Sequence, residues 1–121
     1  MKVAVAKYPI QAPADFAAFA ERQAAVLGAA AAQGARVAVL PEYLSLELAA
    51  TLDAGTQADL HASLAAIQRY REDWLALYAR LAASLDMYVV AGTFLLAHGD
   101  GRYRNRCDVF TPQGAHLWQD K

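Results

Sequence analysis

The stretch Arg36-Val-Ala-Val-Leu-Pro-Glu-Tyr-Leu-Ser-Leu-Glu47 carries the clearest structural signal in the chain. Residues 37–40 are apolar without interruption and end at Pro41, which predicts a short strand buried on both faces and then a change of direction. Glu42 therefore follows the carboxyl end of a core strand, the edge where open α/β folds collect ligands and catalytic groups. The alternative is a solvated loop carboxylate, the common state of an acidic residue.

Length and composition limit the class of protein. The 121 residues suffice for one domain, or part of one, with a buried core. A hydrophobic content of 57% with 19% charged residues excludes disorder, and no apolar run is long enough to span a bilayer. A net charge of −1 gives no footprint for nucleic acid or an acidic membrane, so small molecules or proteins are the expected partners.

The expected location is the cytoplasm. Lys7 and Pro9 interrupt the first apolar run before it reaches the length of a signal-peptide core. Cys107 is the single cysteine and has no internal disulfide partner, which fits a reducing compartment.

The first forty residues predict a strand, a helix and a strand. Residues 2–8 are expected to form a central strand covered on both faces. A helix over residues 16–33 is capped by Asp15 and stopped by Gly34. The economical connection to residues 37–40 is a right-handed crossover between parallel strands.

The middle of the chain is predicted to be helical. One or two turns are expected over residues 44–52, and a helix over residues 57–84 that Thr56 caps, with a break near residues 70–73. Its apolar stripe is interpreted as core or subunit contact rather than a ligand groove. The stripe comprises Leu60, Leu64, Ile67, Arg71, Trp74, Leu75, Tyr78, Leu81, Ala82 and Leu85.

The last third predicts a meander. Residues 87–96, 103–111 and 115–121 form the expected strands, joined by turns at residues 97–102 and 112–114. A crossover unit followed by a meander favours the α/β class, with a mixed sheet and helices on one side.

Alternation along the strand at residues 103–111 separates its side chains into two faces. Asn105 and Cys107 share one face, and Arg106 and Asp108 lie on the other. Cys107 is read as a small buried hydrophobe rather than a reactive thiol, because no helix N-terminus is predicted there to lower its pKa.

Neither a metal nor an organic cofactor is expected. The three histidines, His61, His98 and His116, stand in separate elements, and none is paired at a metal-ligand spacing. A nucleotide-binding fold is disfavoured, because no phosphate-binding glycine loop follows the first strand.

Four segments in order give the chain a family likeness. They are Lys2-Val-Ala-Val-Ala6, Gly34-Ala-Arg-Val-Ala-Val-Leu-Pro-Glu42, Tyr88-Val-Val-Ala-Gly-Thr93, and Tyr103-Arg-Asn-Arg-Cys-Asp-Val-Phe-Thr-Pro-Gln-Gly114 followed by Lys121. With these the chain resembles the amino-terminal half of the nitrilase superfamily, the carbon–nitrogen hydrolases. The resemblance implies half of a four-layer α-β-β-α sandwich.

The resemblance also implies roles for individual residues. Glu42 matches the family's general base, and Lys121 matches the lysine that stabilises the oxyanion of the tetrahedral intermediate. Asn105 and Tyr43 are expected to bind substrate or support the site. The family's nucleophilic cysteine lies tens of residues beyond the lysine, so the role is not given to Cys107.

The expected activity is hydrolysis of a small amide or nitrile through a Glu-Lys-Cys site, with amides favoured because most of the family act on them. A homo-oligomer is expected as well. Residues 1–121 are interpreted as the amino-terminal part of one domain, ending at the catalytic lysine and inactive alone. The alternative is a non-catalytic α/β binding or oligomerising module on the same scaffold, which a cysteine after Lys121 would exclude.

Overall fold

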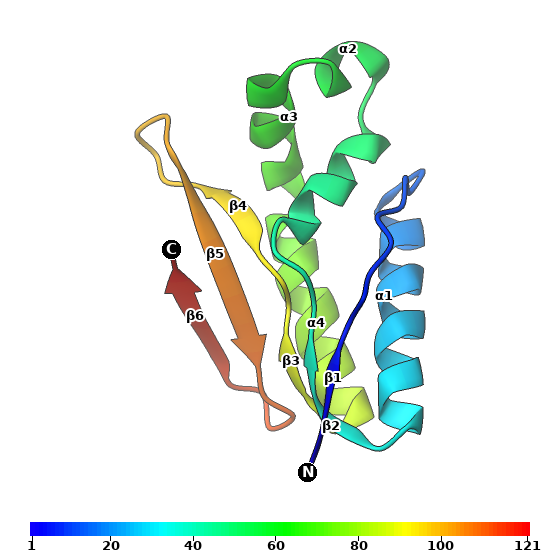
Figure 1. Ribbon diagram of the computed structural model, residues 1–121. Coiled ribbons are helices and arrows are strands. Elements are labelled where there is room, and N and C mark those ends of the chain that lie inside the picture. Colours follow the sequence, from blue (N-terminus) through cyan, green and yellow to red (C-terminus); the bar gives the residue numbers. More distant parts are fainter.

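In the computed structural model, which describes residues 1–121, six strands form one mixed sheet with helices packed on one face (Figure 1). The hydrogen-bonded order is β1-β2-β3-β5-β4. Strands β3 and β4 pair with successive parts of one edge of β5, and β6 pairs with its other edge. The first three strands are parallel, and β5 is antiparallel to all its neighbours. The strands are β1 (Lys2–Val5), β2 (Ala35–Val39), β3 (Tyr88–Val90), β4 (Phe94–Ala97), β5 (Tyr103–Phe110) and β6 (His116–Asp120). The predicted mixed α/β class is confirmed.

The predicted strand-helix-strand unit is present as β1, α1 (Phe16–Ala32) and β2. The Asp15 carboxylate accepts a hydrogen bond from the Ala18 N–H at 2.8 Å, and Gly34 follows the helix at a φ of 85°. The prediction that β1 is covered on both faces is wrong, because Val3 and Val5 are 52% and 76% exposed. Helix α1 packs on the opposite face of β1, and β1 is an edge strand.

The helical middle is divided more finely than predicted. It consists of η1 (Leu44–Thr51), α2 (Ala54–Gln57), α3 (Leu60–Ile67), η2 (Gln68–Tyr70) and α4 (Arg71–Leu85). The predicted break lies at η2. The predicted Thr56 cap is wrong: the carboxylate of Asp53 caps α2 by accepting from the Thr56 N–H, and Asp59 caps α3. An aspartate one turn earlier offers a stronger acceptor than a threonine hydroxyl.

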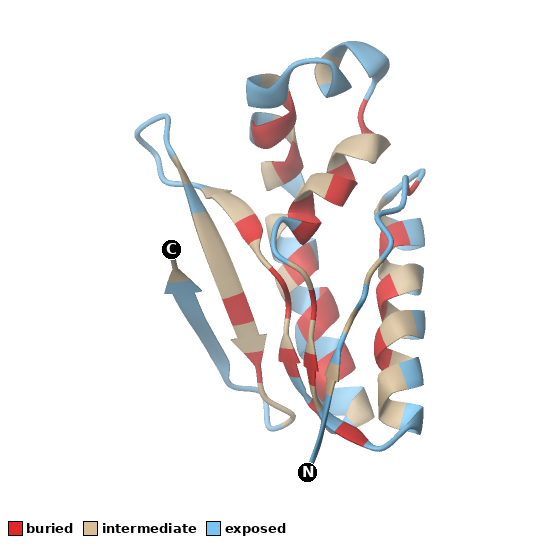
Figure 2. Cartoon of the chain, viewed as in Figure 1, coloured by how far each residue is buried: buried red, intermediate tan, exposed pale blue.

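The core lies between the sheet and helices α1 and α4 (Figure 2). Its centre is the Trp74 ring, whose centroid lies 5.6 Å from Phe19, 5.0 Å from Tyr78 and 5.2 Å from Phe94. These contacts join α1, α4 and β4. Six of the ten residues of the predicted apolar stripe are buried here, so most of it is not free for a subunit contact; three others are partly buried, and Leu60 is 62% exposed.

The predicted continuous strand at residues 87–96 is wrong, because a bulge divides it into β3 and β4. Three residues lie between Val90 and Phe94, whereas two lie between their partners Val109 and Arg106 on β5. Gly92 lies inside the bulge at a φ of 64°. A bulge adds one unpaired residue and bends the strand, and bulges are common next to active sites.

The sheet face away from the helices carries exposed apolar side chains. Val3, Val5, Tyr88 and Leu117 are 38–76% exposed. None of the helices is long and apolar enough to cross a membrane.

Candidate active site

Glu42, Asn105 and Lys121 converge at one edge of the sheet. Asn105 Nδ2 donates to Glu42 Oε1 at 2.7 Å, and Lys121 Nζ lies 3.5 Å from the same oxygen. Glu42 follows β2, Asn105 lies within β5, and Lys121 follows β6. The structure therefore brings together three of the four residues that the sequence singled out.

Asn105 contacts both of the other groups. Its side chain binds Glu42, and its backbone carbonyl accepts a hydrogen bond from the Lys121 N–H at 3.2 Å. That backbone bond continues the β5–β6 ladder one step beyond the Arg106–Asp120 pair. Asn105 Oδ1 is buried and has no hydrogen-bond partner.

The two charged groups are accessible. The Glu42 side chain is 47% exposed and that of Lys121 is 77% exposed. Both contacts fall on Oε1, which leaves Oε2 of Glu42 without a hydrogen bond. A carboxylate with one free oxygen can accept a proton, and a neighbouring ammonium can stabilise a developing negative charge.

Tyr43 does not join this group. Its side chain is 46% exposed and forms no hydrogen bond, and its backbone contributes the turn that follows Glu42. Its backbone N–H donates to Thr93 Oγ1 at 2.6 Å. The sequence did not single out Thr93, since a threonine within an apolar strand carries no chemical signal.

Cys107 lies two residues beyond Asn105 on the same strand and is half-buried. Burial, and then the negative charge of Asp108, raise the pKa of the Cys107 thiol. Both effects oppose formation of the thiolate, which is the nucleophilic form.

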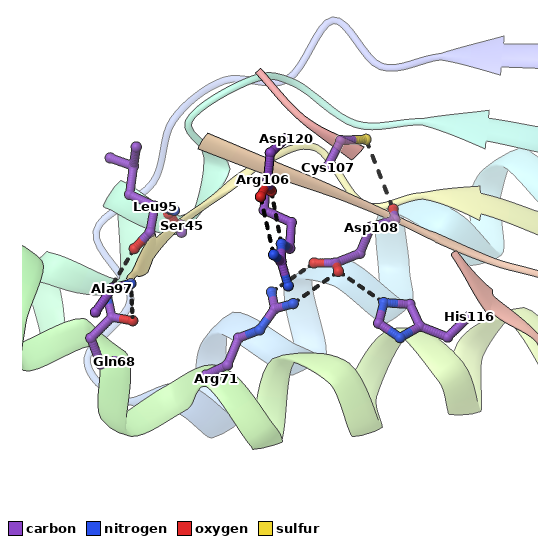
Figure 3. Close-up of polar contacts among 10 residues, drawn as sticks. All are labelled: Ser45, Gln68, Arg71, Leu95, Ala97, Arg106, Cys107, Asp108, His116 and Asp120. Carbon is purple, nitrogen blue, oxygen red and sulfur yellow. Dashed lines mark hydrogen bonds and ion pairs between the residues drawn. The ribbon is translucent and has the colours of Figure 1, made fainter. Parts of the chain in front are cut away.

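A buried ion-pair cluster on the other face of β5 was missed by the sequence reading (Figure 3). The Asp108 carboxylate, 1% exposed, accepts two hydrogen bonds from Arg71 at 2.7 and 2.9 Å. His116 Nε2 lies 2.8 Å from the same carboxylate. From the sequence, Arg71 was placed in the apolar stripe of the helix. The available signal was Asp108, an acidic residue on the face of β5 opposite Cys107 and Val109.

The end of β6 has its own anchor. The Arg106 guanidinium donates to both Asp120 oxygens at 2.8 and 3.1 Å and lies 3.7 Å from the Trp118 ring centroid. The hydrogen bond from Arg106 lowers the pKa of Asp120, which keeps this carboxylate ionised beside Lys121. These contacts fix the strand that delivers Lys121.

Glu47, the second carboxylate of the opening stretch, belongs to a separate buried network. Its oxygens accept hydrogen bonds from the Tyr8 hydroxyl at 2.8 Å and the Gln11 N–H at 3.2 Å. Gln23 and Tyr78 extend the network into the core. Burial and the Glu47 carboxylate raise the pKa of Tyr8 to about 12, so the phenol stays a donor.

Other features do not coincide with the site. A hollow of about 340 Å³ lies between α1 and strands β1 and β2, and its mainly apolar lining includes neither Glu42 nor Lys121. No three His, Cys, Asp or Glu side chains are grouped so that they could share a metal ion.

Comparison with known proteins agrees with this architecture. A crystal structure of a carbon-nitrogen hydrolase from Helicobacter pylori G27 is similar, with a TM-score of 0.73 at 17% sequence identity over 98% of this chain. The chain spans 38% of the length of that protein. No curated protein sequence matches. The sequence profile of the carbon-nitrogen hydrolase family matches residues 2–119, and the chain belongs to that family.

Proposed function

We propose that the full-length protein hydrolyses a non-peptide carbon–nitrogen bond, that of a small amide rather than a nitrile. Glu42 is the general base, and Lys121 stabilises the oxyanion. One observation supports this proposal: Asn105 Nδ2 lies 2.7 Å and Lys121 Nζ lies 3.5 Å from Glu42 Oε1. The two residues are 63 and 79 positions away from Glu42 in the chain.

In the proposed reaction Glu42 takes the proton of a cysteine thiol, and the thiolate sulfur bonds to the amide carbonyl carbon. The Lys121 ammonium stabilises the resulting oxyanion. When the carbon–nitrogen bond breaks, the proton on Glu42 passes to the leaving amine and an acyl-cysteine remains. Glu42 then takes a proton from water as the water oxygen adds to the acyl carbon. The acid leaves, and the thiol regains its proton.

The nucleophile is proposed to come from sequence that follows Lys121. Cys107 is the single cysteine of the chain, and its surroundings raise its pKa. The preference for amides follows the family resemblance, because most carbon–nitrogen hydrolases are amidases or related acyl-transfer enzymes. A homo-oligomer is proposed on the same ground.

The test is Glu42→Gln in the full-length protein, assayed by ammonia release from a panel of small primary amides. Turnover should fall about 10²- to 10⁴-fold, the usual contribution of a general base. Glu21→Gln, on the exposed face of α1, is the matched control and should keep full activity. Near-normal activity of Glu42→Gln would reject the base role. Absence of any amide or nitrile turnover in the unmodified protein would favour the non-catalytic module.

A further inference from the structure

The turn that follows Glu42 is strained. Tyr43 adopts a left-handed conformation with φ 63° and ψ 20°. The other non-glycine residue with a positive φ is Asp86, which ends α4 and is of a type that tolerates this conformation. A tyrosine is strained in this conformation, and such strain persists where the surrounding structure fixes it.

Thr93 supplies the contacts that fix this turn. Its Oγ1 accepts a hydrogen bond from the Tyr43 N–H at 2.6 Å, and its backbone carbonyl accepts one from the Ser45 N–H at 3.2 Å. Ser45 Oγ in turn accepts from the Leu95 N–H at 3.1 Å. The turn is thereby tied to the bulge between β3 and β4.

The direction of the Glu42 side chain depends on this turn. The side chain is 47% exposed, so core packing does not orient it. Its remaining constraints are the hydrogen bond from Asn105, the longer contact with the exposed Lys121 ammonium at 3.5 Å, and the backbone that continues into Tyr43. A change at Tyr43 would therefore move the carboxylate relative to Asn105 and Lys121.

We propose that Thr93 is a positioning residue for Glu42: it holds the left-handed Tyr43 turn and so aims the carboxylate at Asn105 and Lys121. The catalytic part of this inference rests on the proposed role of Glu42 as the base. Thr93 itself touches no reacting group. Its contribution is the acceptor Oγ1, which serine retains and valine lacks at nearly the same shape.

The structural test measures hydrogen exchange at the Tyr43 N–H in the full-length protein. Thr93→Val should speed this exchange by about tenfold or more, because one hydrogen bond is lost, whereas Thr93→Ser should keep the protection. Thr111→Val is the matched control, because it removes an equivalent bond from the Ala115 N–H to Thr111 Oγ1 at a distant turn. Unchanged protection in Thr93→Val, or equal loss in Thr93→Ser, would overturn the proposal whatever the enzyme's reaction is.

The functional test follows alkylation of the nucleophilic cysteine by iodoacetamide, read peptide by peptide at neutral pH. Thr93→Val should slow alkylation about 10- to 100-fold, since small misplacements of a catalytic group have effects of this size. Thr93→Ser and Thr111→Val should react like the unmodified protein. If Glu42→Gln slows alkylation and Thr93→Val does not, positioning is refuted. If Glu42→Gln itself has no effect, the proposed function fails, while the exchange result for Thr93 stands separately.

Discussion

Gly92→Ala tests how the bulge supports the turn of Glu42. A Cβ at Gly92 would lie 2.2 Å from the Pro41 carbonyl oxygen and 3.2 Å from Leu44 Cβ. The nearer contact is with backbone, so no side-chain rotation relieves it. The alanine would also have to adopt a φ of 64°. To fit the added methyl group, either the backbone at Pro41 moves or the bulge between β3 and β4 opens.

The expected magnitude has two parts. A left-handed conformation costs alanine about 1–2 kcal/mol relative to glycine. Overpacking against a fixed neighbour adds about 1–3 kcal/mol. Together the free energy of unfolding should fall by roughly 3 kcal/mol. Gly34→Ala isolates the first part, because Gly34 has a φ of 85° and nothing within 4 Å of the added Cβ.

The assay is urea unfolding of the full-length protein and the two variants at the same pH. Gly28→Ala, in the middle of α1 with open space around the added Cβ, completes the set and should stabilise by about 0.5–1 kcal/mol. Amide turnover should fall in Gly92→Ala and not in Gly34→Ala. A cost for Gly92→Ala no larger than that for Gly34→Ala would refute the argument from close approach.

Two further predictions concern β5. Asp108→Asn leaves Arg71, 13% exposed, without its counter-charge, and should lower the free energy of unfolding by about 3 kcal/mol. Asp86→Asn, in an exposed pair at 3.7 Å, should cost under about 0.5 kcal/mol in the same urea titration, and equal costs would contradict the expectation. The pKa of the Cys107 thiol is raised, so its thiolate appears only above the usual thiol range. Iodoacetamide should therefore label Cys107 slowly at neutral pH and faster as the pH rises; rapid labelling at neutral pH would contradict this.

The strand-helix-strand unit could be predicted because its signals are local. An Asp15 cap, a Gly34 stop and two uninterrupted apolar runs each act within a few residues. What an apolar run does not reveal is which of its faces this chain covers. Ala4 packs against the core, whereas Val3 and Val5 are exposed, although all three belong to the same run.

The bulge and the Asp108 cluster depend on contacts distant in sequence. Gly92 in an apolar strand is compatible with a plain strand, and what makes a bulge there is the approach of the Pro41 carbonyl. Likewise, Arg71 fits a helix surface equally well until β5 places a buried carboxylate beside it. The apolar run that ends at Pro41 pointed to Glu42, whereas the role of Glu42 and the choice of Lys121 came from the family resemblance. No local pattern could predict that Asn105 would contact both residues.

The two halves of the candidate site are aligned by one short strand. Val90 of β3 pairs with Val39 on the strand that leads to Glu42, and with Val109 on the strand that carries Asn105. The Val90 carbonyl also accepts the Leu40 N–H at 3.0 Å, two residues before Glu42. The position of the carboxylate relative to Asn105, and through its backbone to Lys121, is therefore fixed by β3 and the bulge that follows it. This explains why the bulge carries both the close approach at Gly92 and the hydrogen bonds of Thr93.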